Sequence, residues 1–268
     1  SMHNYLDRIW NEVRRVVIPG GIVCINIGDA TRTINGHFRL YPNHVRVTAC
    51  FHAMGFSQLP SIIWRKPNNS PTKFMGSGML PPGAYVTHEH EHLLIFRKGG
   101  KRSFTDDQKK QNRQKSAYFW EERNTWFSDI WFDLRGTSQR LSEKAARGRS
   151  AAFPFELPFR LINMFSVKQD TVLDPFLGTG TTMLAAICAG RNSTGFEIDP
   201  DLRQTIVHQI GDAQAISRQT TRRRLCAHRD FVTARMQAQK ELKHINTWYG
   251  FPVMTRQEIE LQLDIVDK

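Results

Sequence analysis

The residues best suited to chemistry lie between Asp170 and Asp199. A short apolar run at 171–173 meets the glycine-rich turn DPFLGTG at 174–180, and a helix of small residues is predicted to begin at Thr181. A second predicted strand ends near the carboxylate of Glu197. Glycines let a ligand approach the backbone closely, and a carboxylate at the next strand end can accept hydrogen bonds from two ribose hydroxyls. The spacing therefore predicts a nucleotide-binding βαβ unit.

Three classes of ligand fit this outline, and the details of the turn separate them. A dinucleotide fingerprint requires a third glycine at the position of Met183, and a P-loop requires a lysine that the turn lacks. The remaining string, Asp-Pro-Phe-x-Gly-Thr-Gly-Thr-Thr at 174–182, resembles the S-adenosylmethionine loop of DNA amino-methyltransferases. The alternative is a glycine turn that only packs within the core.

Polar residues also follow a predicted strand near the start of the chain. The run at 22–27 is typical of a buried parallel strand and leads into Gly28-Asp29. Asn26 and Asp29 therefore stand at a strand's carboxyl end, where α/β sheets bind ligands. A capping or turn role for Asp29 is an equally good interpretation.

A group of histidines near position 90 contains a formal zinc motif, H-E-x-x-H, formed by His88, Glu89 and His92. On a helix the two histidines would share a face and could hold zinc. The apolar run at 93–96 and the glycines at 99–100 predict a strand instead. On a strand His88, His90 and His92 would share one face, which is a second way to hold a metal. We interpret the segment as a strand with a polar end and predict no metal site.

The composition narrows the class of protein. The chain has 268 residues, enough for one large α/β domain, and carries a formal net charge of +12. Such a basic balance favours a polyanionic partner. The sequence has no apolar run of about 18 residues and starts with polar residues, so we expect neither a membrane span nor a secretory signal. Four scattered cysteines without C-x-x-C spacing are typical of reduced thiols, and we expect a cytoplasmic protein.

Other elements must position these groups. Periodicity predicts helices at 5–17, 44–54 and 159–165 and a strand at 59–66, with a polar loop at 67–82. The charged segment 100–116 is predicted to be mobile, and the basic segment 136–150 is a candidate phosphate-contacting strip. Seven aromatic residues crowd the segment between them, where a small hydrophobic core is favoured over stacking on nucleic acid. They are Tyr118, Phe119, Trp120, Trp126, Phe127, Trp131 and Phe132.

The last third of the chain is basic and helix-permissive. At 202–243 a solvated helix face and contact with a DNA backbone are equally good interpretations. A capped helix is predicted at 257–266, either docked on the chain itself or forming a contact in a homodimer.

The order of these strings is similar to that of the β-class DNA amino-methyltransferases over about residues 5 to 200. The resemblance implies an α/β fold with a Rossmann-like S-adenosylmethionine-dependent methyltransferase sheet, mostly parallel. It divides the chain into a catalytic half at 1–98, a basic target-recognition region at 99–150, a cofactor-binding half at 151–200 and a basic helical extension at 201–268.

The resemblance also implies a cofactor site. Phe153 and Pro154 would lie beside the donor S-adenosylmethionine, and Glu197 would bind its ribose. The residues around its methionine would be Asp174, Phe176, Gly178, Gly180 and Thr181.

The implied function is that of a site-specific DNA methyltransferase, acting on double-stranded DNA in a prokaryotic nucleoid as part of a restriction–modification system. The strings Asn-Ile-Gly-Asp and Phe-Pro-Phe-Glu-Leu-Pro favour a cytosine-N4 over an adenine-N6 target. Methylation at cytosine C5 would need a nucleophilic cysteine after proline, and none of the four cysteines follows one.

One motif of the family is absent. Its catalytic tetrad, Asp/Asn/Ser-Pro-Pro-aromatic, does not occur, since Leu80-Pro81-Pro82-Gly83 lacks both the polar and the aromatic residue. The resemblance places the tetrad upstream of Tyr5, on a strand between those ending at Asp174 and Asn26. We therefore expect an upstream segment or a second polypeptide to supply it. The alternative is a noncatalytic DNA-binding or accessory subunit that retains the fold.

Overall fold

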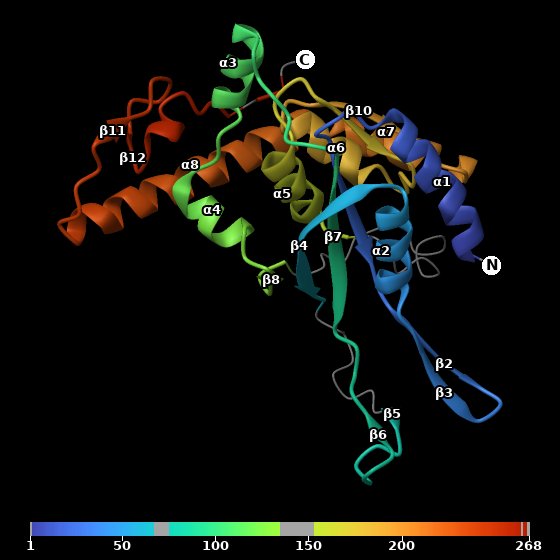
Figure 1. Cartoon of the computed structure of the whole chain (residues 1–268). Helices are drawn as coiled ribbons and strands as arrows, with labels where there is room; N and C mark the ends of the chain where they lie inside the picture. Colours follow the sequence, from blue (N-terminus) through green and yellow to red (C-terminus); the bar gives the residue numbers. More distant parts are fainter. Residues whose placement is uncertain (1, 67–74, 135–152, 264, 267–268) are drawn as a thin grey trace. The chain divides into compact units, whose positions relative to one another are not determined.

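The computed structural model describes residues 2–66, 75–134, 153–263 and 265–266 (Figure 1). The chain forms two compact units. The first comprises 1–103 and 128–136, and the second comprises 104–127 and 137–268. Each unit has its own hydrophobic core, so each is described by itself.

The first unit is built on a four-stranded mixed sheet in the order β1-β7-β4-β8 (Figure 1). Its strands are β1 (Ile22–Ile27), β4 (Phe56–Arg65), β7 (His90–Lys98) and β8 (Ile130–Trp131). The long strand β7 pairs antiparallel with both β1 and β4, whereas β8 pairs parallel with β4. The register of β4 shifts between Leu59 and Ile62, at Pro60, which has no N–H to give to the ladder.

Two helices, α1 (Met2–Val16) and α2 (Asn43–Ala53), bury their apolar stripes against this sheet. Their core is aromatic. Phe51 of α2 is fully buried, stacks on Phe96 of β7 at 4.5 Å between ring centroids and meets Phe56 of β4 edge-on at 5.0 Å. Both helices and strands β4 and β7 were predicted from sequence, and their existence is confirmed.

The first unit also carries two hairpins that the sequence analysis missed. Strands β2 (Ala30–Ile34) and β3 (His37–Tyr41) are joined by Asn35-Gly36, whose φ angles of 51° and 78° are those of a two-residue hairpin turn. Strands β5 (Met75–Gly76) and β6 (Ala84–Tyr85) form the second hairpin, inside the stretch predicted to be a polar loop. Figure 1 shows both hairpins extending away from the four-stranded sheet.

The second unit contains the predicted βαβ element. Strands β9 (Thr171–Asp174) and β10 (Asn192–Gly195) pair in parallel, and α6 (Thr181–Cys188) connects them. The helices α5 (Glu156–Phe165) and α8 (Ala213–Gln237) contact α6. Because Ala185 and Ala186 are small and fully buried, these helices can approach α6 closely. The elements η1 (Pro200–Leu202) and α7 (Arg203–Gly211) follow β10.

The rest of the second unit joins segments far apart in sequence. It comprises α3 (Asp107–Lys115), α4 (Trp120–Trp126), β11 (His244–Ile245), β12 (Pro252–Val253) and the short helix η2 (Arg256–Glu258). The core interpretation of the aromatic segment is confirmed in part. Phe119 and Trp126 are buried here, but Trp131 is buried in the first unit, so the segment does not form one small core. Phe127 and Phe132 are exposed.

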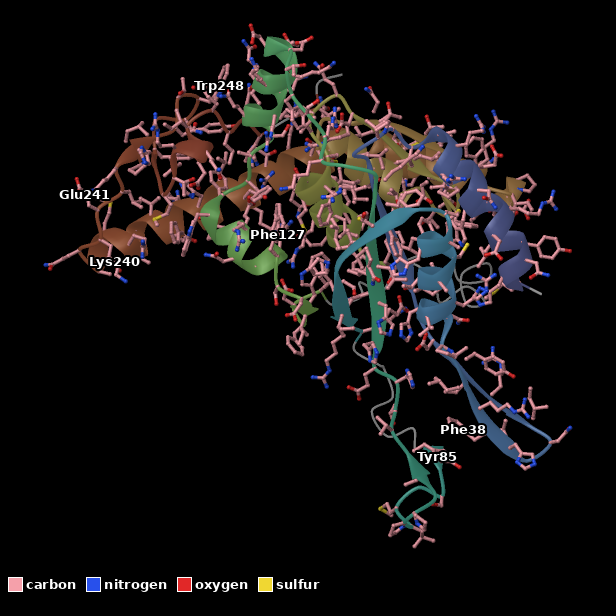
Figure 2. All side chains as sticks on the ribbon, viewed as in Figure 1. Phe38, Tyr85, Phe127, Lys240, Glu241 and Trp248 are labelled. Atoms are coloured by element: carbon pink, nitrogen blue, oxygen red, sulfur yellow. The ribbon has the colours of Figure 1, made fainter. Side chains whose placement is uncertain are left out.

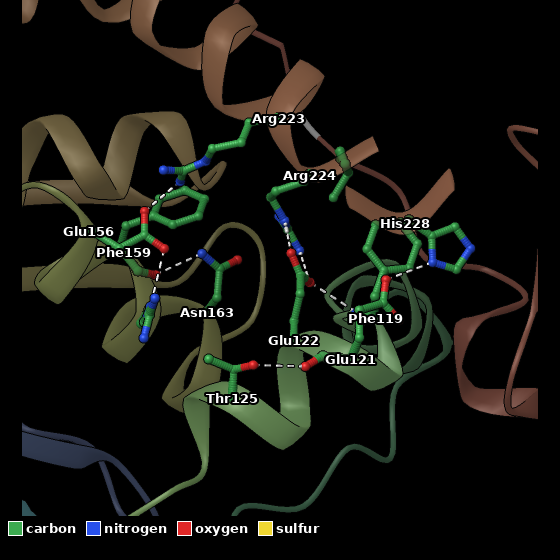
Figure 3. Close-up of polar contacts among 12 residues, drawn as sticks. Phe119, Glu121, Glu122, Thr125, Glu156, Phe159, Asn163, Arg223, Arg224 and His228 are labelled. Carbon is green, nitrogen blue, oxygen red and sulfur yellow. Dashed lines mark hydrogen bonds and ion pairs between the residues drawn. The ribbon is translucent and has the colours of Figure 1, made fainter. Parts of the chain in front are cut away.

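Polar pairs between α4 and α8 account for part of the basic charge at the end of the chain (Figure 3). Arg224 donates to both oxygens of Glu122, at 2.6 and 2.7 Å, with side chains only 9% and 12% exposed. Arg223 pairs with Glu156 of α5. These arginines stabilise the unit itself, whereas Arg222 and Arg229 of α8 are exposed.

Three sequence expectations need correction. The segment 100–116, predicted to be mobile, contains α3, which begins because the Asp106 carboxylate accepts the backbone N–H groups of residues 108 and 109. The predicted terminal helix is a single 3₁₀ turn, although its capping box between Thr255 and Glu258 is present. It docks on the second unit, where Glu258 is 2% exposed and accepts the N–H of Trp120.

The third correction concerns β1, predicted as a parallel strand. Its partner among the described residues is the antiparallel strand β7, and only Ile25 of β1 is fully buried. Within the described part of the chain β1 and β9 each pair along one edge only. The strand expected beside them stays a prediction, and the phosphate strip at 136–150 lies outside the described residues. No helix of the described residues is long and apolar enough to cross a membrane.

Candidate functional site

The glycine turn between β9 and α6 depends on two left-handed residues. Gly178 has φ of 56° and Gly180 has φ of 90°, a conformation that side chains other than glycine rarely adopt. A Cβ on Gly178 would lie 3.9 Å from the Phe176 oxygen and meet nothing nearer, so the space beside this backbone is open. The turn therefore presents bare backbone at the amino end of α6, where N–H groups lack partners within the helix.

Glu197 lies against this turn. One carboxylate oxygen accepts the Gly178 N–H at 2.7 Å, and the other accepts the Asp199 N–H at 2.8 Å. Each carboxylate oxygen has two lone pairs, so both can still accept a hydroxyl. Asp174 holds the other side of the turn by accepting the Phe176 N–H at 2.9 Å.

The turn is also fastened to β10 by packing. A Cβ on Gly195 would come within 2.6 Å of the Leu177 side chain, and Leu177 donates its N–H to the Phe196 oxygen at 2.9 Å. Leu177 is buried, whereas the side chains of Phe176 and Ile198 are 48% and 98% exposed. The turn is thus packed against β10 through Leu177, while Phe176 and Ile198 next to it are open to solvent.

Six of the eight predicted cofactor residues come together on this βαβ element: Asp174, Phe176, Gly178, Gly180, Thr181 and Glu197. Thr181 is buried, with its hydroxyl 3.3 Å from that of Thr179. Phe153 and Pro154 belong to the same unit and precede α5, whose first turn begins with the bond from the Leu157 N–H to the Pro154 oxygen. The role of these residues toward a cofactor stays a prediction.

A second polar group crosses three strands of the first unit. Asn26 of β1 donates through Nδ2 to Glu91 of β7 at 2.7 Å, and Glu91 accepts from Lys66, which directly follows β4, at 2.9 Å. Because Nδ2 faces a carboxylate, the amide orientation is fixed and Oδ1 points elsewhere. Asn26 Oδ1 is buried and has no hydrogen-bond partner in the described structure. A buried acceptor of this kind calls for a donor from a water molecule or from another group.

Sequence reasoning singled out Asn26 but missed Glu91 and Lys66 as its partners. Asn26 pairs with Leu93, and Glu91 lies two positions before Leu93 on the same strand. Glu91 in turn pairs with Trp64, and Lys66 lies two positions after Trp64. Each of the two contacts therefore joins diagonal neighbours on adjacent strands. Only the strand order β1-β7-β4 reveals this, and no local motif marks it.

Asp29 has the capping role that was one of the two interpretations. Its carboxylate accepts the backbone N–H of His44, at the start of α2, at 3.2 Å and the ring Nδ1–H of His44 at 2.8 Å. Burial alone would raise the pKa of Asp29, but these two bonds outweigh burial and hold the pKa below its ordinary value. The carboxylate is therefore charged and fixed at the helix start.

Among the described residues, the group of potential metal ligands is not the row of three histidines on one strand face that was considered from the sequence. His92, rather than all three histidines, meets Asp29 and His44, and the ligand atoms of these three residues lie within 4.8 Å of one another. The rings of His44 and His92 stack at 4.0 Å with an angle of 17° between their planes. Since imidazole binds metals in its ring plane, two nearly parallel rings cannot both point at one ion as they stand. Helix capping and ring stacking explain this cluster.

Comparison with known proteins agrees with this architecture. The sequence model of the family N6_N4_Mtase, described as DNA methylase, matches residues 1–208. The chain is 55% identical over 262 residues to the type II methyltransferase M.MthZI of Methanothermobacter thermautotrophicus, covering 98% of this chain and 72% of that protein. It is 54% identical over 213 residues to M.MjaI of Methanocaldococcus jannaschii, covering 80% of this chain and 69% of that protein.

A solved structure supports the fold. It is that of TTHA0409 of Thermus thermophilus, a candidate DNA modification methylase, in complex with S-adenosyl-L-methionine. The TM-score is 0.64 at 34% identity, over 78% of this chain and 76% of that one. The fold is thus the α/β fold of DNA methyltransferases. The chain belongs to the family of DNA amino-methyltransferases.

Proposed function

We propose that this chain transfers a methyl group from S-adenosylmethionine to an exocyclic amine of a DNA base, with cytosine-N4 favoured over adenine-N6. The observation that carries the proposal is the open glycine turn with Glu197 hydrogen-bonded to it. The base preference rests on the strings around Asn26 and Phe155, and the restriction–modification context rests on relatives named type II methyltransferases. The enzyme would then act on DNA in a prokaryotic nucleoid.

The turn supplies the donor side of the reaction. Glu197 would accept the two ribose hydroxyls, and the methionine would lie against the turn, beside Phe176 and the backbone at Gly178 and Gly180. The bound donor would contribute an electrophilic sulfonium methyl group. These groups hold and orient it and take no part in proton transfer.

The acceptor side needs a group that this chain lacks. An exocyclic base amine is a weak nucleophile because its lone pair is delocalised into the ring. The family tetrad would accept both amine hydrogens, so that the lone pair points at the methyl, and would stack its aromatic ring on the flipped base. We propose that an upstream segment or a second polypeptide provides this tetrad on a strand added to the free edge of β1, next to the unpaired Oδ1 of Asn26.

Donor binding and methyl transfer test the proposal separately. Calorimetry with S-adenosylmethionine should give one site per chain, because the turn is complete. Transfer of radiolabelled methyl to DNA should be weak or absent with the chain alone and appear when the natural upstream segment is added. A chain that fails to bind the donor would contradict the proposal.

A noncatalytic accessory subunit is the second candidate, and the missing tetrad is the observation that favours it. In that case the chain does not bind the donor, and adding an upstream segment does not restore transfer. The methylated base can be identified by nuclease digestion and mass spectrometry. N6-methyladenine as the only product would overturn the cytosine preference and leave the reaction class intact.

A further inference from the structure

The β2–β3 hairpin has two different faces. Cross-strand pairing places Arg32 opposite Arg39 and Ile34 opposite His37, so their side chains share one face with Tyr41. All five of these residues are exposed. The opposite face carries Phe38, which stacks on Tyr85 of the β5–β6 hairpin at 4.3 Å and 17° (Figure 2). The second hairpin thus covers one face in part, at Phe38, while the other face is bare.

The positive charges on the bare face destabilise the free protein. Two arginines directly opposite each other on adjacent strands repel. Arg32 donates to the Thr31 oxygen at 2.9 Å, and among the described residues no carboxylate pairs with Arg32 or Arg39. The segments 30–41 and 67–86, which include both hairpins, contain no aspartate or glutamate at all. An anion between the two guanidinium groups would relieve the repulsion.

The hairpin is also held firmly enough to present this face. The Asn35-Gly36 turn fixes its register, and the stacked rings of Phe38 and Tyr85 tie its back to the second hairpin. The second hairpin is itself tight, since a Cβ on Gly76 would come within 2.1 Å of the Gly83 oxygen. The two hairpins therefore support one another, and less conformational entropy is lost when the exposed face binds.

From these features we propose that the bare face of the β2–β3 hairpin binds the backbone of duplex DNA, with Arg32 and Arg39 contacting phosphates. This rests on the proposed function, which makes DNA the substrate. A two-stranded ribbon has the width that the major groove admits, and arginine pairs with phosphate through two parallel bonds. Single-stranded nucleic acid is disfavoured because such binding relies on rows of stacked aromatic rings, and this face carries the rings of Tyr41 and His37 alone. DNA contact is thereby extended beyond the predicted recognition region at 99–150.

The test measures binding of a fluorescent 30-base-pair duplex across a range of salt concentrations. Each phosphate contact contributes about 0.9 to the slope of log affinity against log salt, so R32A/R39A should lower the slope by about 2. The same relation gives an affinity loss on the order of 50-fold at about 0.1 M salt. The matched control is R8A/R14A, which removes two exposed positive charges from α1 of the same unit and should leave the slope at its original value.

A conservative variant separates charge from folding. R32K/R39K should restore most of the slope, because lysine keeps the positive charge, and should melt like the wild type. R32A/R39A should melt at or slightly above the wild-type temperature, because the repulsion between the two arginines is removed. A single strand of the same sequence should bind more weakly than the duplex.

The outcomes are distinguishable. The hairpin inference is overturned if R32A/R39A keeps the wild-type slope, or if R32A/R39A and R8A/R14A lower the slope by the same amount. Neither result bears on the proposed methyl transfer. A slope that R32K/R39K does not restore also overturns it. Failure of the proposed function would show instead as a wild-type chain that neither binds S-adenosylmethionine nor transfers methyl groups when the upstream segment is present.

Discussion

The glycine turn of the second unit and the polar group of the first unit are built in opposite ways. The turn takes all of its residues from one stretch of about 25 positions and is held by bonds from its backbone N–H groups to the carboxylates of Asp174 and Glu197. The polar group joins Asn26, Lys66 and Glu91 across three strands. A local site tolerates change elsewhere in the chain, whereas a site assembled by strand register fails when any of the three strands shifts.

Breaking the turn should have the largest effect. G180V places a β-branched side chain at φ of 90°, where a Cβ also lies 3.4 Å from Ile206. The strain costs about 1–3 kcal/mol, which corresponds to a loss of donor affinity of up to about 150-fold. Calorimetry with S-adenosylmethionine checks this, with G211V as the control, because a Cβ on Gly211 meets nothing within 4 Å. Unchanged donor affinity in G180V would mean that the turn is not the donor site.

The next largest effect is expected at Glu197. E197Q keeps the shape but removes the charge, so it should weaken S-adenosylmethionine binding by about 10- to 100-fold, the value of one charge-assisted hydrogen bond. D201N removes an exposed carboxylate nearby and should bind the donor normally. Equal affinities of the two variants would exclude Glu197 from the ribose site.

A change in the polar group of the first unit should lower stability and leave donor binding unchanged. E91Q weakens the bonds to Asn26 and Lys66 and should lower the free energy of unfolding by about 1–2 kcal/mol, leaving donor affinity unchanged. E89Q is the matched control, since Glu89 pairs with Arg65 at the exposed surface. Denaturant unfolding and donor titration on the same samples measure both quantities. A loss of donor affinity in E91Q would show that the two regions are not independent.

The smallest expected effect is on pH dependence, and the two units should respond with opposite signs. Burial lowers the pKa of His92 below 6.5, and the positive charge on His44 adds to this effect. For His228, burial would lower the pKa, but the hydrogen bond and charge of Glu121 outweigh burial and raise it. Neutral His92 therefore stabilises above pH 6.5 and loses this contribution as the pH falls through its lowered pKa. Charged His228 stabilises fully below pH 6.5 and loses this contribution as the pH rises through its raised pKa.

Thermal melts of H92Q and H228Q between about pH 5 and 8 test these signs. The destabilisation by H92Q should shrink toward acid, and that by H228Q should shrink toward alkali. Parallel pH profiles of the two variants would contradict the assignment.

The sequence predicted elements whose signals are local. The turn at 174–182, the strand at β7 and the helices α1, α2, α5 and α6 were all foreseen, because glycine spacing and apolar periodicity lie within single segments. The Asn35-Gly36 turn is an equally local signal that was overlooked, and it would have given the β2–β3 hairpin.

What could not be predicted depends on contacts between distant segments. The composition of 100–116 suggested mobility, but Asp106 starts a helix there and Asn112 of that helix donates to Gln169. Likewise, the partners of Asn26 follow from the antiparallel register of β1 and β7, which no string in either strand records. Charge alone could not tell that Arg224 of α8 is bound to Glu122.

The contact of Leu177 with Gly195 has a practical consequence for protein design. A side chain at position 195 would force this leucine to move, so we expect the nine-residue motif to need the strand behind it when it is transplanted. Under the proposed function, the smallest portable donor-binding cassette would be the whole stretch from Thr171 to Glu197. Grafts that carry only the glycine loop into another α/β scaffold should misplace its backbone and fail to bind.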